Sequence, residues 1–281
     1  MTSLILAVIA SFFVGIALKV SENAGRPRLP VALINYCVAL LGALAVWAAN
    51  GALGFPLPVL LTGMFAGITW VVSLIAIMYA VKLTGVAVSS AITRIAIIVP
   101  IILSLTIWGE EPTTLILFGI ALAIVAVVVM SWGSARAPNG VGRANTLAII
   151  GLLCASGLAQ LASKLFAQYC EPDFKASWSV VLFASAIVTT LAWMLIVRVK
   201  PSRADIRYGV FVGVPNLLSA LFLVAALTQL PAVVVFPTTS AGGMVLLALA
   251  GAIIFRERLS RATLLGIAMA VLAVVVVNIR Q

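Results

Sequence analysis

Ten long apolar runs, separated by short polar links, constrain what this chain can fold into. They cover residues 4–20, 31–49, 57–81, 86–108, 113–132, 146–169, 178–197, 208–228, 232–255 and 262–279. A helix needs roughly 20 apolar residues to cross a hydrocarbon core of about 30 Å. Runs such as LFGIALAIVAVVVM are apolar on both faces, which excludes the alternating polarity of a barrel strand. The sequence therefore predicts an all-α membrane protein with ten transmembrane helices.

The composition argues against several other classes of protein. With 64% hydrophobic and 9% charged residues, the chain has more apolar surface than one soluble core could bury. It has no His, no GxxxxGK[ST] loop and no Gly-rich dinucleotide motif, so we expect no cofactor, no metal and no ATP-driven step. Because no nucleophile, base and metal ligand converge, we expect no enzyme. The net charge of +10 is spread over short loops, so we expect no nucleic-acid partner.

The N-terminal residues and the cysteines add two further expectations. The segment MTS before the first run has no basic region and no clear cleavage site, which argues against a removable signal peptide. Cys37, Cys154 and Cys170 form no CxxC pair and no even set. We therefore interpret them as packing residues without disulfides.

One helix–turn–helix segment occurs twice in the chain. TIWGEEPTTLILFGIALAIVAVVVM, from Thr106, matches IIFRERLSRATLLGIAMAVLAVVVV, from Ile253, with Glu110 opposite Glu257. A polar linker, residues 134–145, separates two sets of five runs, so we expect five-helix repeats at 1–133 and 146–281 within one membrane domain. Because each repeat has an odd number of spans, the second copy enters the membrane from the opposite side. The pattern predicts an inverted repeat.

The basic residues predict the orientation, because cytoplasmic loops keep more Arg and Lys than external loops. The links after even-numbered runs contain a single basic residue, Lys175. The links after odd-numbered runs hold Arg26, Arg28, Lys82, Arg136, Arg143, Arg198, Lys200, Arg203, Arg207, Arg256, Arg258 and Arg261. We therefore expect both termini of this multi-pass protein to lie outside the cytoplasm.

The motif, the repeat and the span count together resemble a known family. GEEPTTLILFGIALAIVAVVV and RERLSRATLLGIAMAVLAVVV follow the fourth and ninth runs, as in EamA-type members of the drug/metabolite transporter superfamily. The resemblance covers essentially the whole chain. It implies a monomer-sized basket around a central cavity, which helices 1, 3, 4, 6, 8 and 9 line, with helices 5 and 10 at the periphery. Known members export amino acids and other metabolites, or take up and exchange substrates.

Arg94 is the most informative polar residue within a predicted span. The residues that recur with it at three- and four-residue intervals predict one polar stripe facing the cavity: Ser90, Thr93, Ile97, Pro100 and Ser104. Arg94 lies eight residues inside its run, about 12 Å along the helix and close to the midplane. A central Arg costs about 2.5 to 3.5 kcal/mol on insertion scales. It therefore either faces the cavity and binds an anionic group, or snorkels to the headgroups.

Other polar residues within the runs have competing interpretations. Lys19 and Lys164 occupy equivalent places in the first and sixth runs, where snorkelling is the simpler role, and Gln160 shares a face with Lys164. In the third run Trp70 and Ser73 share a face, with Trp70 either near the ligand, in packing or at the interface. All five are candidate cavity-lining residues.

Proline and glycine positions indicate two further features. Asn216 follows Pro215, and FPTTSAGG from Phe236 is predicted to break the ninth helix near Thr239, or else to form a kink satisfied by its own hydroxyls. Both Asn216 and Thr239 are candidate substrate contacts. We place Asn35 and Tyr36 near the interface. GMFAG and GVFVG favour close helix contact.

The acidic residues limit the mechanism. All seven lie at run ends or in links, so no carboxylate is expected near the bilayer centre. One central Arg with flanking Lys favours a carboxylate-bearing or otherwise anionic substrate. Together with the family resemblance, the sequence predicts a secondary transporter of the bacterial cytoplasmic membrane. It would move a small polar metabolite by alternating access, with export of amino acids or organic acids as the first reading. The alternatives are import or exchange of an organic anion, and a structural or receptor-like membrane protein.

Overall fold

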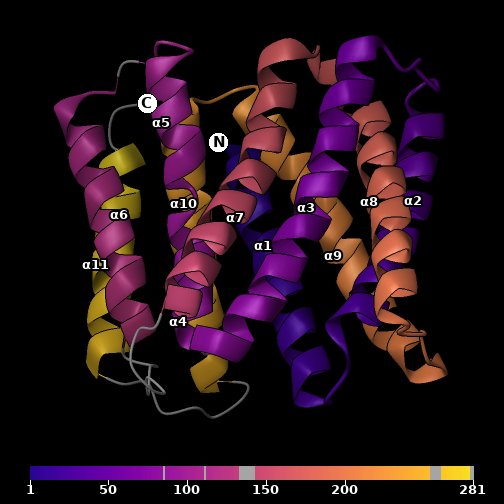
Figure 1. The fold of residues 1–281 in the computed structure, drawn as a ribbon. Coiled ribbons are helices and arrows are strands. Elements are labelled where there is room, and N and C mark those ends of the chain that lie inside the picture. Colours follow the sequence, from indigo (N-terminus) through magenta and orange to yellow (C-terminus); the bar gives the residue numbers. More distant parts are fainter. Residues whose placement is uncertain (85, 111, 133–142, 254–260, 279–281) are drawn as a thin grey trace. The chain divides into compact units, whose positions relative to one another are not determined.

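The computed structural model describes residues 1–281 except 85, 111, 133–142, 254–260 and 279–281 (Figure 1). In these residues the secondary structure consists of helices joined by short links, without strands. The helices are α1 (Thr2–Asn23), α2 (Arg28–Ala49), α3 (Leu57–Thr84), α4 (Val86–Ile95), α5 (Ile98–Thr106), α6 (Thr114–Trp132), α7 (Arg143–Tyr169), α8 (Lys175–Val197), α9 (Arg203–Leu227), α10 (Ala232–Ile253) and α11 (Arg261–Asn278). A short 3-10 helix, η1 (Pro172–Phe174), precedes α8.

Seven of the described helices are long and apolar enough to cross a membrane. Their apolar segments are Thr2–Asn23, Arg28–Ala49, Leu57–Leu83, Thr146–Tyr169, Pro172–Val197, Arg203–Leu227 and Ala232–Ala250. At 1.5 Å per residue, 19 to 27 residues span about 29 to 41 Å. The chain is therefore a multi-pass membrane protein. Shorter apolar helices cover Ile92–Thr106, Thr114–Ala126 and Leu264–Val276.

The fourth predicted run is not one helix, which corrects the sequence interpretation. α4 ends at Ile95 and α5 begins at Ile98. The cause lies in Pro100, which has no N–H to donate to the carbonyl of Ala96 and whose ring disfavours a continuous turn. The amide of Val99 donates to that carbonyl instead, at 3.1 Å. Pro100 is then tolerated because it lies in the first turn of a new helix.

The ninth predicted run is continuous, which decides between the two readings of FPTTSAGG. α10 extends from Ala232 to Ile253 with Pro237 inside it. The Thr239 hydroxyl donates to the carbonyl oxygens of Val235 (2.8 Å) and Phe236 (3.1 Å). The predicted break is therefore wrong: α10 continues through Pro237, and the Thr239 hydroxyl bonds the backbone of its own helix.

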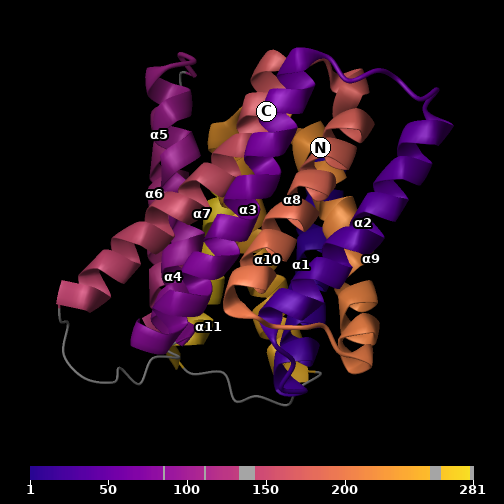
Figure 2. The same ribbon diagram turned by 45° about the vertical axis from the view of Figure 1, so that its right-hand side comes forward.

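The helices pack into two compact units. Unit 1 consists of Met1–Val71 and Ala162–Gln229, and unit 2 of Val72–Leu161 and Leu230–Gln281. In unit 1, α9 packs on α1 and α2, and α2 also packs on α8 (Figure 2). In unit 2, α6 packs on α11, α10 lies against both, and α4 lies against α6. Each unit combines segments from both halves of the sequence, so this division differs from the predicted repeats, which stay a prediction.

Glycines bring helices of unit 1 into close contact, as GMFAG and GVFVG predicted. A Cβ added at Gly67 of α3 would overlap the Ser185 hydroxyl and the Leu182 carbonyl oxygen of α8. A Cβ added at Gly213 of α9 would lie 2.7 Å from Cβ of Val38 and 2.9 Å from the Asn35 carbonyl oxygen of α2. Both close approaches involve backbone atoms, which cannot move aside as a flexible side chain would.

Small residues play the same role in unit 2. A buried cluster on α6, α10 and α11 consists of Ala123, Ala126, Ala241, Ala270 and Ala273. Partly buried side chains, including Leu122 and Val245, surround it. Because lipid tails are as apolar as the helix surface, close van der Waals packing of small residues favours helix association in a bilayer.

Gly67→Ala should destabilise unit 1, because its new methyl group meets backbone atoms of α8. Overpacking of this kind costs about 1 to 3 kcal/mol. Thermal unfolding of purified protein should show a lowered midpoint. Gly151→Ala on α7 is the matched control, because nothing lies within 4 Å of its added Cβ. Equal midpoints for the two variants would contradict the tight contact.

Candidate functional site

Arg94 lies beside the helix break that divides the predicted fourth span. It occupies the last turn of α4, one residue before that helix ends, and its side chain is half-buried. The free carbonyls at a helix C-terminus carry partial negative charge and stabilise a cation there. Within the described residues no hydrogen bond or ion pair engages the guanidinium.

The residues of the predicted polar stripe lie on two separate helices. The Thr93 hydroxyl donates to the Ser89 carbonyl oxygen at 3.0 Å, so its proton is already used. The side chain of Ser90 lies outside the described residues. Beyond the break, Pro100 and Ser104 are buried on α5. Because α4 and α5 are separate helices, their residues no longer follow one 3.6-residue period, and a single stripe is the wrong description.

A second polar contact joins α3 and α7 within unit 2. The hydroxyls of Ser73 and Ser156 lie 2.9 Å apart, so Ser73 faces α7. Gln160 is one turn beyond Ser156 on the same face of α7 and is half-buried. Serine hydroxyls that bond one another across two helices fix their register and keep polar atoms satisfied in an apolar surrounding.

Lys164 is buried, which argues against the simpler prediction for it. Its side chain is 6% exposed, so it does not extend freely toward the headgroups. Lys19 on α1 is half-buried, and for this residue snorkelling stays a prediction. Two residues predicted as equivalent therefore differ in burial.

Asn216 has a partner that sequence reasoning missed. Its Nδ2 donates to Oδ1 of Asn35 at 3.1 Å, which links α9 to α2 within unit 1. Asn35 is 6% exposed and the neighbouring Tyr36 is 5% exposed. Both are therefore buried between helices. Because α2 begins at Arg28, they lie about two turns inside the helix and not at its start, and their depth in the membrane stays a prediction. The signal was present in the sequence as two Asn within otherwise apolar runs.

Aromatic rings pack around Tyr36, the neighbour of Asn35 in sequence. The Tyr36 and Phe183 ring centroids are 6.4 Å apart, and Trp70 meets Phe183 edge-on at 6.2 Å. Trp70 lies near the middle of α3, which excludes the interfacial-anchor reading. Its contact with Phe183 supports packing.

Glu110 caps the N-terminus of α10, a helix of unit 2 that is distant from it in sequence. Its two carboxylate oxygens accept hydrogen bonds from the amides of Ala232 (3.1 Å) and Val233 (3.2 Å), at the N-terminus of α10. Those amides have no partner within their own helix, and the negative charge is favourable at a helix N-terminus. The structure thus places Glu110 beside a helix end, as the sequence predicted. Glu257, its equivalent in the repeat, lies outside the described residues.

Asp205 is buried at the N-terminus of α9. Its Oδ2 accepts from the backbone amide and the hydroxyl of Ser202, both at 2.7 Å, in a capping box. The Arg26 guanidinium lies 3.9 Å from the other carboxylate oxygen. A carboxylate that is 1% exposed is thus held by a helix cap and a neighbouring cation, and it ties the α1–α2 link to α9.

All three cysteines are free, as predicted. Cys37 and Cys154 are exposed, so they do not pack in the interior, and that part of the prediction was wrong. The Cys170 Sγ lies 3.7 Å from the Thr62 hydroxyl oxygen. Burial raises the pKa of the Cys170 thiol, while its hydrogen bond with Thr62 lowers it. A thiol in this setting is a packing group.

Glu110→Ala should destabilise the protein, because two amides of α10 lose a charged acceptor. The expected loss is about 1.5 to 3 kcal/mol, the range for a hydrogen bond to a charged group. Glu110→Gln should lose less, because its carbonyl oxygen still accepts one bond. The measurement is the thermal midpoint, with Glu171→Ala at an exposed position as control. A changed pH dependence of transport with an unchanged midpoint would contradict a structural role.

Comparison with known proteins relates the chain to a fold and to one relative. No model of a known protein family matches it. An uncharacterized protein of Haemophilus influenzae is 24% identical over 192 residues, or 67% of this chain and 65% of that protein. The match thus covers less than two thirds of the relative. A protein crystal structure matches 100% of this chain and 99% of its own chain, with a TM-score of 0.79 and 18% identity. The chain therefore shares its fold with an experimentally solved protein.

Proposed function

We propose that the chain is an EamA-type secondary transporter of the bacterial cytoplasmic membrane. It moves a small polar metabolite with an anionic group by alternating access. Export of an amino acid or organic acid is our first proposal, and import or exchange of an organic anion is the second. The observation that supports an anionic substrate is the position of Arg94. This half-buried cation lies at a helix break and has no partner among the described residues.

Helix breaks support a transport function. Lipid offers no hydrogen bonds, so non-helical backbone at membrane depth persists only where protein or a water-filled cavity satisfies it. Discontinuous helices often form the binding sites of secondary transporters for this reason. The α4–α5 break has Arg94 directly before it, and this positive charge suits a carboxylate or phosphate.

The apolar helices support ten spans. Seven helices have the length and apolarity to span a membrane, and three shorter apolar helices occupy the remaining predicted runs. Two of the shorter ones, on α6 and α11, pack against each other. The α4–α5 pair is the third, and its two parts together cover the predicted fourth span.

Packing within each unit supports the inverted repeat. The gap-free sequence match places Ala123 opposite Ala270 and Ala126 opposite Ala273, and all four lie in one cluster of unit 2. An axis that relates two copies of a helix brings equivalent residues together in this way. In unit 1, the Gly motif of the third predicted span packs on α8 and that of the eighth packs on α2. These two pairs of helices are also equivalent under the repeat, although the Gly motifs are offset by one residue from the gap-free match.

Arg94→Ala should reduce affinity for anionic ligands about ten-fold to a hundred-fold, because a charge-assisted contact contributes roughly 1.5 to 3 kcal/mol. Arg94→Lys should reduce this affinity by a smaller factor, because an ammonium keeps the charge but cannot reproduce the planar fork of a guanidinium. Binding is measured by ligand-induced thermal shift, and transport by counterflow in liposomes, over a panel of carboxylates and phosphates. Lys82→Ala is the control, because Lys82 is an exposed cation in the last turn of α3.

The outcomes separate the candidate roles of Arg94. A snorkelling Arg94 would tolerate Lys, and Ala would help membrane insertion, because an expensive charge is removed. Unchanged affinity in Arg94→Ala therefore contradicts the anion site. Binding without counterflow of any ligand would instead favour the receptor-like alternative over transport.

The orientation is a separate proposal that rests on loop charge. Among the described residues, four basic side chains lie in links that follow odd-numbered predicted spans: Arg26, Arg198, Lys200 and Arg203. Lys175 lies in a link that follows an even-numbered span. By the positive-inside rule, the first group is cytoplasmic and both termini are external.

Cysteine labelling of intact cells checks this orientation. In a background without Cys37, Cys154 and Cys170, Gly54→Cys in the α2–α3 link should react with a membrane-impermeant thiol reagent. Asn23→Cys at the end of α1 should react only after the cells are opened. Neither position is buried, so accessibility within the protein does not limit the reaction. The reverse pattern would invert the proposed topology and leave the fold untouched.

A further inference from the structure

A small cavity lies in unit 1 where the α2–α3 link meets the start of α8. Its volume is about 250 Å³, and Asn50, Leu53, Asp173, Lys175 and Ala176 line it. One water occupies about 30 Å³ in the liquid, so the cavity admits a polar group of several atoms. Neither Arg94 nor the Asn35–Asn216 pair contributes to it.

Hydrogen bonds hold this link in place. The carbonyl oxygen of Leu53 accepts from Nε1 of Trp47 (2.6 Å) and from the hydroxyl of Ser177 (3.2 Å). The chain reaches that position through positive φ angles at Gly51 (82°) and Ala52 (50°). Trp47 also stacks on Phe55 at a centroid distance of 5.5 Å. The link is thus fastened to α2 on one side and to α8 on the other, and the cavity wall is preformed.

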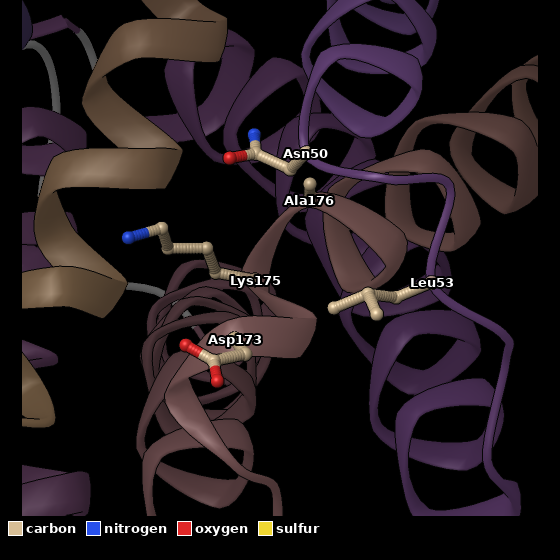
Figure 3. Close-up of a pocket in the computed structure, with 5 residues that line it drawn as sticks. All are labelled: Asn50, Leu53, Asp173, Lys175 and Ala176. Carbon is tan, nitrogen blue, oxygen red and sulfur yellow. The ribbon is translucent and has the colours of Figure 1, made fainter.

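The cavity presents complementary polar groups. Figure 3 shows the polar ends of Asn50, Lys175 and Asp173 directed toward the same side, with Leu53 on the other. No ion pair joins Asp173 to Lys175, or either of them to any other residue that the structure describes. Nδ2 of Asn50 donates to the Val46 carbonyl oxygen at 2.7 Å, which leaves its Oδ1 as an acceptor. A cation, an anion and a neutral acceptor therefore remain available together.

The position along the helices sets the depth of the cavity. Asn50 directly follows α2, and Lys175 is the first residue of α8, so both lie at ends of membrane-spanning helices. Trp is enriched where the hydrocarbon core meets the headgroups, and Trp47 with Phe55 forms such an aromatic pair beside the cavity. The cavity thus lies at headgroup level.

We infer that this cavity binds a lipid headgroup that carries a phosphate and a primary ammonium. The Lys175 ammonium meets the phosphate, while the Asp173 carboxylate and Oδ1 of Asn50 accept hydrogen bonds from the ligand's ammonium. A quaternary ammonium has no N–H to donate, so a choline headgroup fits less well. A glycerol headgroup has no cation to pair with Asp173. The chemistry thus selects phosphatidylethanolamine over the choline and glycerol lipids.

Lipid competition in native mass spectrometry tests this inference. The purified full-length protein is exchanged into mixtures of phosphatidylethanolamine with phosphatidylcholine or phosphatidylglycerol. Wild type should retain the ethanolamine lipid preferentially. Lys175→Gln and Asp173→Asn should each reduce that preference about two-fold to five-fold, the scale of an exposed ion pair. Asp173→Asn should in addition raise retention of phosphatidylglycerol, because the cation stays while the anion is gone.

Matched controls and a soluble ligand make the test decisive. Glu171→Gln and Lys200→Gln change exposed charges that do not line the cavity, and they should keep the wild-type preference. Soluble phosphoethanolamine should compete much less well than the lipid. Equal retention of the three lipids by wild type, or an unchanged preference in both cavity variants, overturns the site. Equal competition by phosphoethanolamine overturns the lipid as its occupant.

Discussion

The backbone hydrogen bond is the interaction on which the rest of this structure depends. In hydrocarbon an unpaired amide or carbonyl costs several kcal/mol, so most of the chain that the structure describes pairs these groups within helices. Departures from a helix therefore need their own partners. Two of the capped N-termini show how: Glu110 supplies acceptors to α10, and Ser202 with Asp205 supplies them to α9. The acidic residues that lie at span ends thus have structural tasks there.

Prolines show that local sequence alone does not decide whether a helix breaks. Pro100 and Pro237 both lie within long apolar runs, yet only Pro100 separates two helices. At Pro237 the following Thr239 returns its hydroxyl to the backbone, while the α4–α5 junction closes a tighter turn through Val99 and Ala96. The two sites therefore differ in the backbone around the proline and not in the proline itself.

The helices were predictable from sequence and most of the side-chain partners were not. Span length and apolarity placed the long helices within a few residues, apart from the break after Ile95, and Gly spacing identified the close contacts at Gly67 and Gly213. These features depend on neighbours in the chain. The Asn35–Asn216 bond and the cap by Glu110 join residues more than a hundred positions apart, and no local period encodes such pairs. Arg94 is intermediate: its cost in a span was predictable, whereas its place beside a break depended on Pro100.

The proposed repeat explains why some equivalent positions are alike and others differ. A seam between two copies of the same helix must be complementary to itself, because each residue meets the copy of its neighbour. Ala123, Ala126, Ala270 and Ala273 satisfy that condition with identical small side chains. A bound metabolite has no such symmetry, so residues that contact it need not match. Arg94 stands opposite Ala241, and Pro100 opposite Leu247. The break and Arg94 thus occur in one copy of the proposed repeat alone, which is what the proposed anion site would require.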